Sequence, residues 1–575
     1  MKKHYETHVE DTDKLISVAG PVLDYKSWYE RYRKLMEEQA QRKYGLYTPT
    51  SEGDNDFPSI PGMIARYSAL GLTNEQMAAN PVWVDKTGNG HDLQMKNFAW
   101  KGMSGVGGYV TNKDIYEYDL DRYSYTFIEN STKVHDFYIV FELIGYDENF
   151  KDGFNLDVRS ISQGLKYRKT YTKNGIYIFQ YKDEEGLDDL FAIGYNGNGG
   201  ARSNFTVKIL PLYPGFIFGD GVDDYAVTEK QLNFEDTYTV YTAFVPFQND
   251  PARNMILCGK NDTKDFSINY SGTHLNFKPS TGVNLVARIN QFALLVCKRN
   301  KDITTIINLS TGESRSLKSV EFISNPGLYY LWRNVFATFH AKAAIAGQTI
   351  CNGYFSTDED DEKVLNWYKK QMPWLFPDQA WTVTGKTNED ADRATIANIT
   401  GNDNNLVLSN FGFAEGSGYN EEGEYAGYLV TDGVDDIIRS SAFTVGKDWT
   451  TVGEWEFLKE DAIKIAGIAK FNSFRFYNYS FIGRMNVYIN SDLGTNVIGE
   501  SVKAATSKGS VYLDFNSVTE VTPGDKVDLG QSLFIGYNVN NFTKLAFKNL
   551  AIYPKVLSKE DCIKAYIYLQ TLKAK

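Results

Sequence analysis

The sequence is poor in the residues that most metal, disulfide and nucleophilic sites require. It has four cysteines and six histidines among 575 residues. Cys258, Cys297, Cys351 and Cys562 form no C-x-x-C pair, so we interpret them as small buried residues and expect neither a disulfide framework nor a zinc site. The sequence also has no H-E-x-x-H helix and no G-x-S-x-G elbow. We therefore predict that the chain is not an enzyme and has no cofactor.

An excess of positive charge and long apolar runs are missing as well. The formal net charge is −12, and no Lys/Arg stripe alternates with aromatic residues, so we expect no nucleic-acid partner. No stretch approaches the roughly 20 apolar residues of a membrane helix, so we expect no membrane insertion. Two lysines near the N-terminus are followed by no apolar run, unlike a secretory signal peptide. We therefore expect assembly in the cytoplasm where the chain is made.

Aromatic residues, in contrast, are abundant, with 39 Tyr and 35 Phe. Such residues favour strands, because their rings pack well on a pleated, half-buried surface. Many short strand-like segments, such as residues 238–245 and 484–489, are separated by turn clusters with few long helical patterns. This spacing indicates an antiparallel sandwich or jelly roll, and the length indicates more than one domain.

The chain also repeats itself. Three segments return later in the sequence. Residues 71–75 and 87–93 return as 385–389 and 400–406, at an offset of about 313. Residues 220–224 return as 432–436, at an offset of 212. At the same offset of 212, Asp236–Val240 aligns with Asp448–Val452. Ser356–Glu359 and Ser558–Asp561 both resemble helix-capping boxes at the ends of the copies. A period this long indicates a duplicated domain.

The change in offset predicts about 100 extra residues in the first copy. We interpret them as a β-rich insertion at about 103–213, because a loop between strands tolerates an inserted domain. The predicted fold is mainly β, with two tandem jelly-roll sandwiches after an N-terminal helical arm. The predicted domains are the arm and linker 1–57, the first sandwich 58–375 and the second sandwich 376–575.

The arm contains one amphipathic segment after Asp24. Trp28, Tyr32 and Leu35 lie on one face at helical spacing and also fit about two heptads, which is marginal for an independent coiled coil. The segment is either a helix docked on its own first domain or an anchoring and oligomerising helix. We predict the second role for these three residues and expect a homo-oligomer.

The repeated Asp-Gly-Val-Asp-Asp segments contain the most conspicuous acidic residues. They are Asp220, Asp223 and Asp224 in the first copy and Asp432, Asp435 and Asp436 in the second. Closely spaced carboxylates can hold Ca²⁺, and two carboxylates can serve a glycosidase. We favour a structural role, because the central glycine suits a tight turn and flanking Asp residues stabilise it. Calcium is the alternative.

These motifs resemble the laminin-G-like/concanavalin-A-like jelly-roll superfamily. The resemblance rests on the Thr87–His91 turn, the Asp220–Asp224 turn and the closing segment Ala551–Glu560. It covers most of the chain beyond the arm and the insertion, although the closing segment of the first copy departs from the pattern. The resemblance implies a sandwich whose exposed aromatic rings could bind host-surface glycans, and fold analogy is the only basis for that expectation.

A narrower resemblance concerns Ile60–Tyr67, Thr87–Leu93 and Asn97–Gly102. These segments are similar to segments in structural proteins of Bacteroides-infecting phages, the crAss-like group among them. This implies a virion protein of the head-fibre, tail-fibre or capsid-decoration type, with other virion proteins as partners. The alternatives are a carbohydrate-binding adhesion module and, less favoured, a polysaccharide-degrading enzyme.

Overall fold

The computed structural model describes residues 56–574, apart from 109–114, 119–125, 129–135, 147–152, 161–163, 183–189, 195–204, 248–254, 261–265, 272–273, 279–283, 287, 321, 323–326, 334–339, 459–465, 481–483, 492, 500, 516–517 and 539–540. Every element below belongs to the compact unit Asp54–Lys575. Trp28, Tyr32 and Leu35 therefore lie outside the described residues, so their predicted anchoring role stays a prediction.

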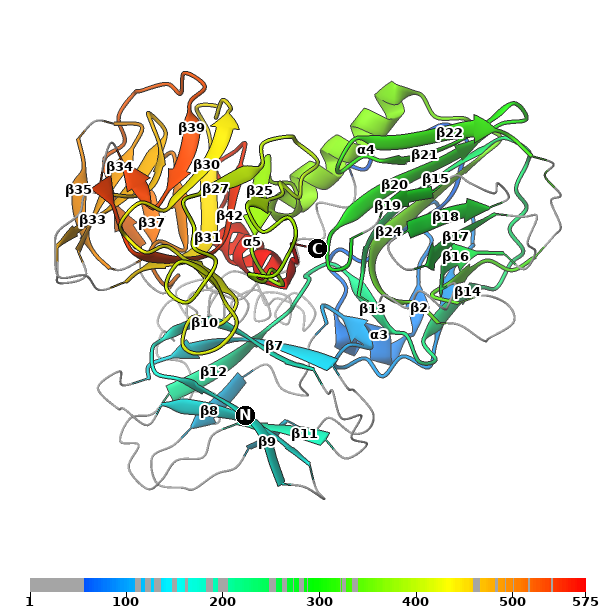
Figure 1. Ribbon diagram of the computed structural model, residues 1–575. Coiled ribbons are helices and arrows are strands. Elements are labelled where there is room, and N and C mark those ends of the chain that lie inside the picture. The colour runs from blue at the N-terminus through cyan, green and yellow to red at the C-terminus, as the bar shows by residue number, and fades with distance from the viewer. Residues whose placement is uncertain are drawn as a thin grey trace, which may run out of the picture. The chain divides into compact units, whose positions relative to one another are not determined.

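The first sandwich consists of two eight-stranded antiparallel sheets (Figure 1). We call the sheet that packs against the closing helix the helix-side sheet, and its partner the far sheet. The helix-side sheet contains β22 (Glu313–Lys318), β21 (Ile303–Asn308), β20 (Ala293–Arg299), β15 (Tyr238–Pro246), β24 (Lys342–Asn352), β13 (Ile217–Asp220) and β4 (Gly105–Val106), with β1 (Met63–Ser68) also on β24. The far sheet contains β19 (Asn284–Val286), β18 (His274–Lys278), β17 (Ser267–Ser271), β16 (Met255–Gly259), β23 (Tyr330–Leu331), β14 (Tyr225–Thr228), β3 (Leu93–Lys96) and β2 (Val82–Trp83).

The second sandwich repeats this plan with two more eight-stranded antiparallel sheets. Its helix-side sheet contains β28 (Gly418–Asn420), β29 (Tyr428–Val430), β42 (Leu545–Tyr553), β31 (Thr450–Phe457), β36 (Ala504–Thr506), β37 (Ser510–Tyr512) and β38 (Val518–Glu520), with β25 (Gln379–Thr382) also on β42. Its far sheet contains β26 (Thr395–Ile396), β27 (Leu406–Ser409), β30 (Ile437–Ala442), β39 (Ser532–Ile535), β32 (Gly467–Lys470), β33 (Phe474–Ser480), β34 (Arg484–Ile489) and β35 (Thr495–Ile498), and β40 (Tyr537–Asn538) pairs with β41 (Asn541–Phe542).

The predicted β-rich insertion is confirmed as two four-stranded sheets of its own, which span residues 115–210 and so begin and end inside the predicted 103–213. One contains β10 (Gly175–Lys182), β7 (Asp136–Ile144), β12 (Phe205–Leu210) and β5 (Ile115–Tyr118), and the other contains β6 (Thr126–Ile128), β11 (Leu190–Gly194), β8 (Phe154–Ser160) and β9 (Gly164–Tyr171). Phe141, Leu156 and Phe205 belong to its separate hydrophobic core. The mainly β fold expected from the sequence is thus the fold observed.

Alternation of side chains produces the cores. On β27, Leu406 and Leu408 are buried, whereas Val407 and Ser409 are exposed, because successive side chains of a strand point to opposite faces. Apolar residues that point inward from both sheets form one core in each sandwich. The outward residues of each far sheet are therefore available for other roles.

A short helix, α3 (Asn74–Ala79), lies near the start of the first sandwich, and a longer helix closes each sandwich. These are α4 (Asp358–Gln371), followed by the 3₁₀ turn η2 (Pro373–Leu375), and α5 (Lys559–Thr571). Ser558 caps α5 as predicted, because its hydroxyl accepts from the Asp561 backbone N–H. The predicted cap of α4 is wrong by one residue: Thr357 is the N-cap and pairs with Asp360, while the Ser356 hydroxyl donates to Asp361 at 2.7 Å.

The two copies also align one residue differently from the sequence match at Val240 and Val452. The Thr239 hydroxyl donates to the Tyr354 carbonyl and accepts from the Ser356 N–H. The Thr450 hydroxyl makes the equivalent bonds with Lys555 and Leu557. Thr239 therefore corresponds to Thr450, an offset of 211 instead of 212. Core packing sets this correspondence, because Trp449 is fully buried in the second sandwich at the position that Tyr238 occupies in the first.

Of the helices that the structure describes, none is both long enough and apolar enough to cross a membrane.

Candidate functional site

The Asp-Gly-Val-Asp-Asp segment of the first sandwich is a hydrogen-bonded turn. The Asp220 Oδ1 atom accepts from the backbone N–H groups of Val222 at 2.8 Å and Asp223 at 3.3 Å. The Asp224 Oδ2 atom accepts from the Asp220 N–H at 3.0 Å. Gly221 has a φ of +79°, a conformation that glycine adopts without steric cost. The side chains thus satisfy the backbone of their own turn.

The second sandwich repeats these bonds. Asp432 Oδ1 accepts from Val434 at 2.7 Å and Asp435 at 3.3 Å, and Asp436 Oδ2 accepts from the Asp432 N–H at 2.7 Å. Gly433 has a φ of +72°. The same five residue types therefore produce the same local structure twice.

Burial distinguishes the last carboxylate of each turn from the others. Asp224 and Asp436 are 0% and 1% exposed. Burial, reinforced by the charge of Asp220, raises the pKa of Asp224 to about 8. Burial raises the pKa of Asp436 to about 6, while hydrogen bonds from the Asp432 backbone and the Ser417 hydroxyl oppose the rise. Both groups resist ionisation more than an exposed Asp does.

The calcium alternative concerns the same carboxylates. In each turn, one ligand oxygen from each of the three Asp residues lies within 4.8 Å of the others. Calcium takes six to eight oxygen ligands, but one oxygen of Asp220 already accepts two backbone N–H groups and one oxygen of Asp432 accepts three. Hydrogen bonding accounts for the shape of the turn, and the calcium hypothesis stays a prediction for melting experiments.

The repeated Thr-Gly-Asn motif connects a turn to the beginning of each sandwich. Thr87 and Asn89 both donate from their side chains to the Ile64 carbonyl, at 3.2 and 3.0 Å. In the second copy, Thr400 and Asn402 both donate to the Asp378 carbonyl, at 3.1 and 2.7 Å. This motif is thus part of the scaffold in both copies.

The strongest candidate for a binding surface is the outward face of the second far sheet. Strand register places six residues in one row across six strands. The row is Val407, Arg439, Phe534, Ala469, Arg475 and Tyr488, on β27, β30, β39, β32, β33 and β34. Their strand neighbours, such as Phe474, Phe476 and Leu533, point into the core. We call this row and the rings that touch it the Arg–aromatic face.

The two arginines of the face lie over aromatic rings. The Arg439 guanidinium is 5.2 Å from the centroid of the Phe534 ring, and the Arg475 guanidinium is 4.1 Å from that of the Tyr488 ring. These cation–π contacts hold each planar donor group against the sheet. Arg475 also donates to the Ser491 carbonyl at 2.6 Å.

Further rings extend the face around Phe534. Phe471 and Tyr537 lie 6.4 and 5.6 Å from Phe534 between ring centroids, and Phe542 lies 5.3 Å from Tyr537. All four rings are half-buried, and Arg439 is exposed. The face therefore presents partly accessible apolar rings beside guanidinium donors.

The first far sheet has an equivalent row with a different composition. Across β3, β14, β23, β16 and β17 it consists of Gln94, Val227, Tyr330, Gly259 and Ser267. Arg333 lies 3.6 Å from the Tyr225 ring centroid and 5.5 Å from that of Tyr330. Among the described residues, the second sandwich thus has the larger aromatic surface, which makes it the better candidate.

The Arg–aromatic face is not predictable from the sequence, although exposed aromatic rings on a sandwich were expected. A local signal exists, because Phe474, Arg475 and Phe476 alternate, as do Leu533, Phe534 and Ile535. That alternation shows which residues share a face of one strand. It does not show that β39 pairs with β30 and β32, which lie far away in the sequence.

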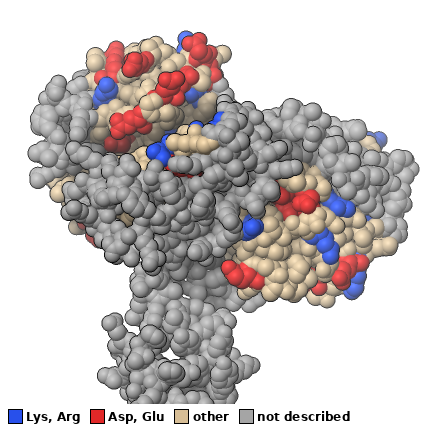
Figure 2. Space-filling model, turned by 90° about the horizontal axis from the view of Figure 1, so that it is seen from below, with Lys and Arg blue, Asp and Glu red and all other residues tan. Residues whose placement is uncertain are grey.

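Charge is distributed without one dominant sign on the view in Figure 2. Acidic and basic side chains are interspersed over the described part of that face.

No family model matches the chain, and no curated protein matches it. Among solved structures, the binding domain of botulinum neurotoxin serotype C1 is similar over 60% of this chain and 91% of its own, with 8% identity and a TM-score of 0.26. Trypanosoma rangeli sialidase in complex with sialic acid is similar over 79% and 86%, with 10% identity and a TM-score of 0.26. The exoplasmic/lumenal domain of VIP36, bound to Ca²⁺ and Man3GlcNAc, is similar over 27% and 85%, with 9% identity and a TM-score of 0.19. At these values none of the similarities assigns an activity or ligand to this chain.

Proposed function

We propose that this chain binds glycans through the Arg–aromatic face of its second sandwich. The observation that carries the proposal is the registered row with Arg439 over Phe534 and Arg475 over Tyr488. A sugar ring has an apolar C–H face that packs on an aromatic ring, and hydroxyl groups that accept hydrogen bonds from a guanidinium. The face supplies both groups on one rigid sheet.

A glycan array that includes bacterial surface polysaccharides tests this proposal. We expect the purified full-length chain to bind a subset of the glycans. Absence of binding to every glycan would leave only a structural role. The same purified protein should release no oligosaccharide from a bound polysaccharide, and release would establish the polysaccharide-degrading alternative.

We further propose that this binding takes place on a phage particle, where the chain would be a head-fibre, tail-fibre or decoration component. The support is the resemblance of residues 60–102 to segments of phage structural proteins. Mass spectrometry of purified particles from an infected Bacteroides host tests this setting. We expect peptides of the chain in the particles, and their absence would exclude a virion role.

The arm has its own proposed role in this setting. We propose that residues 1–57, with Trp28, Tyr32 and Leu35, attach the protein to other virion proteins or to further copies of itself. For a chain without residues 1–50, light scattering should show fewer copies per assembly than for the full-length chain, while circular dichroism shows that the sandwiches remain folded. An unchanged number of copies together with unchanged particle incorporation would contradict the proposal.

A further inference from the structure

A pocket of about 470 Å³ lies where the two sandwiches meet. Its size falls within the roughly 300–1,000 Å³ of pockets that hold small ligands, and such pockets are common at domain boundaries. One side comes from the first sandwich, at residues 291–292 and 309–311 and at the end of α4. The other side comes from the connector that includes η2, from the Thr400–Asn402 turn and from residues 554–555.

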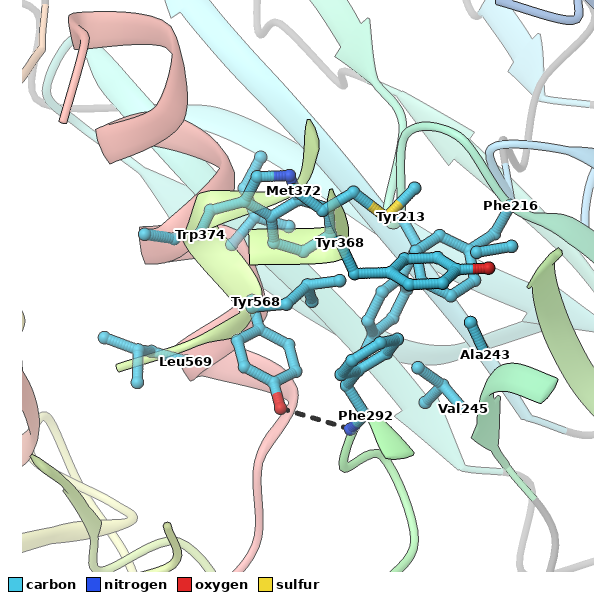
Figure 3. Packing of buried hydrophobic residues seen from close by; sticks show 14 of the residues in the cluster. Tyr213, Phe216, Ala243, Val245, Phe292, Tyr368, Met372, Trp374, Tyr568 and Leu569 are labelled. Atoms are coloured by element: carbon cyan, nitrogen blue, oxygen red, sulfur yellow. Dashed lines mark hydrogen bonds between the residues drawn. The ribbon is translucent and has the colours of Figure 1, made fainter. Parts of the chain in front are cut away.

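Specific contacts hold the two sides together. The Gln291 side chain donates to the Ile399 carbonyl at 2.6 Å, and the Phe292 N–H donates to the Tyr568 hydroxyl at 3.1 Å (Figure 3). Gly401 lies so near Thr311 that an added Cβ would be 3.0 Å from its carbonyl oxygen. The pocket is therefore a fixed product of the docking of the two copies.

The lining combines an apolar floor with a polar rim. Phe292 and Tyr568 are buried in the hydrophobic cluster below, and Figure 3 shows their rings side by side. Hydroxyl and amide side chains, among them Thr311 and Asn366, complete the lining. Such a lining suits a ligand that carries both C–H surface and hydroxyl groups.

The charge of the lining is positive, although the whole chain is acidic. Lys369, Lys370 and Lys555 line the pocket with a single acidic residue, Asp378. Lys370 forms an ion pair with Asp56. Lys555 donates only to the Lys369 carbonyl, at 3.4 Å, and neither it nor Lys369 has an acidic partner within the described residues. Two ammonium groups therefore remain as counter-charges for an anion.

We propose that this junction pocket binds an acidic saccharide, whose anionic group lies between the ammonium groups of Lys369 and Lys555. The proposed glycan binding supports only the choice of a saccharide as ligand. The position and the charge preference follow from the pocket itself.

Calorimetric titration of the full-length chain with methyl glucuronide and with methyl glucoside tests the pocket, because the two probes differ in the carboxylate. We expect at least tenfold tighter binding of the glucuronide, weakened as salt is raised. The double variant K369A/K555A should lose about tenfold in glucuronide affinity, since two charge-assisted hydrogen bonds are removed. Equal affinity for the two probes would overturn the proposal.

Lys363 provides the matched control, because it is an exposed lysine on the same helix that pairs with Glu359 at 2.7 Å and does not line the pocket. K363A should retain glucuronide affinity, and an equal loss in K363A would also overturn the site. If inorganic sulfate alone binds as tightly as the glucuronide, the saccharide assignment is wrong. The double variant F534A/R475A changes only the Arg–aromatic face and should leave glucuronide binding unchanged. The experiment therefore distinguishes a wrong proposal for glycan binding at the face from a wrong proposal for the pocket.

Discussion

At the residue scale, Gly221 and Gly433 determine the two Asp turns. Both have positive φ, at +79° and +72°, which a β-branched residue accommodates poorly. We expect Gly221→Val and Gly433→Val each to lower the free energy of unfolding by about 1–3 kcal/mol. Asp223→Asn is the matched control and should cost less than about 0.5 kcal/mol, because its side chain is exposed.

Thermal melting with added Ca²⁺ and with chelator belongs to the same experiment. The hydrogen-bonded turn predicts no calcium-dependent rise in melting temperature. A rise of several degrees that is lost in Asp223→Asn and Asp435→Asn would contradict the structural role and establish bound calcium.

The buried Asp224 makes stability depend on pH. Its pKa is raised to about 8 in the folded chain, so the folded state holds this proton more tightly than the unfolded state does. Its contribution to stability is therefore fully present below about pH 4 and is lost as pH rises through about 8, by up to about 1.4 kcal/mol per pH unit. Denaturation of wild type and Asp224→Asn at pH 5 and pH 8 measures this loss.

Asp224→Asn should show a flatter pH dependence than wild type, because the amide cannot ionise. Asp436, whose pKa is raised only to about 6, is the internal comparison. Asp436→Asn should also flatten the pH dependence of the free energy of unfolding, but over a narrower pH range that ends near pH 6. Identical pH profiles for wild type and Asp224→Asn would show that this carboxylate does not titrate as proposed.

At the element scale, the cap of α4 is a local test of the fold. The Thr357 hydroxyl accepts from the Asp360 N–H, and the Asp360 carboxylate accepts from the Thr357 N–H at 3.0 Å. Thr357→Ala should destabilise the chain by about 1 kcal/mol. Asp358→Ala, one residue later and without a cap bond, should cost less, and an equal loss would assign the effect to helix charge instead of capping.

At this scale the sandwiches are predictable from the sequence, whereas the surfaces formed between distant elements are not. Turn chemistry and alternation predicted the strands because these signals are local, and direct comparison of repeated segments predicted the two sandwiches and the insertion. The cap at Thr357 differs from the predicted Ser356 because the Ser356 hydroxyl is used by the buried Asp361. The Arg–aromatic face and the junction pocket were not predicted, since both depend on strand order and docking between residues far apart in the sequence.

At the scale of the whole molecule, one hydrophobic cluster joins three modules. It contains Val140 and Ile176 from the insertion, Tyr213 and Phe292 from the first sandwich, and Tyr568 from the second. Hydrogen bonds between the sandwiches accompany it, including those of Asn290 and Tyr213 with Thr571. We therefore expect the described modules to unfold together in spite of their separate cores.

Calorimetry of Tyr568→Ala tests this coupling. The Tyr568 ring lies 5.9 Å from that of Trp374 and 6.0 Å from that of Tyr213 between centroids, and its loss should cost about 3–5 kcal/mol. Wild type should unfold in one main transition, and the variant should separate into at least two. Separate transitions already present in wild type, and unaffected by the substitution, would contradict the coupling.

The affinity of F534A/R475A for a glycan that wild type binds on the array measures most directly whether the Arg–aromatic face binds glycan. Arg315→Ala, at an exposed arginine on β22 of the first sandwich, is the control, and circular dichroism must show both variants folded. Loss of a stacked ring and a charged donor predicts at least a tenfold weaker affinity for F534A/R475A, with Arg315→Ala unchanged. Wild-type affinity in a folded F534A/R475A would contradict glycan binding by this face.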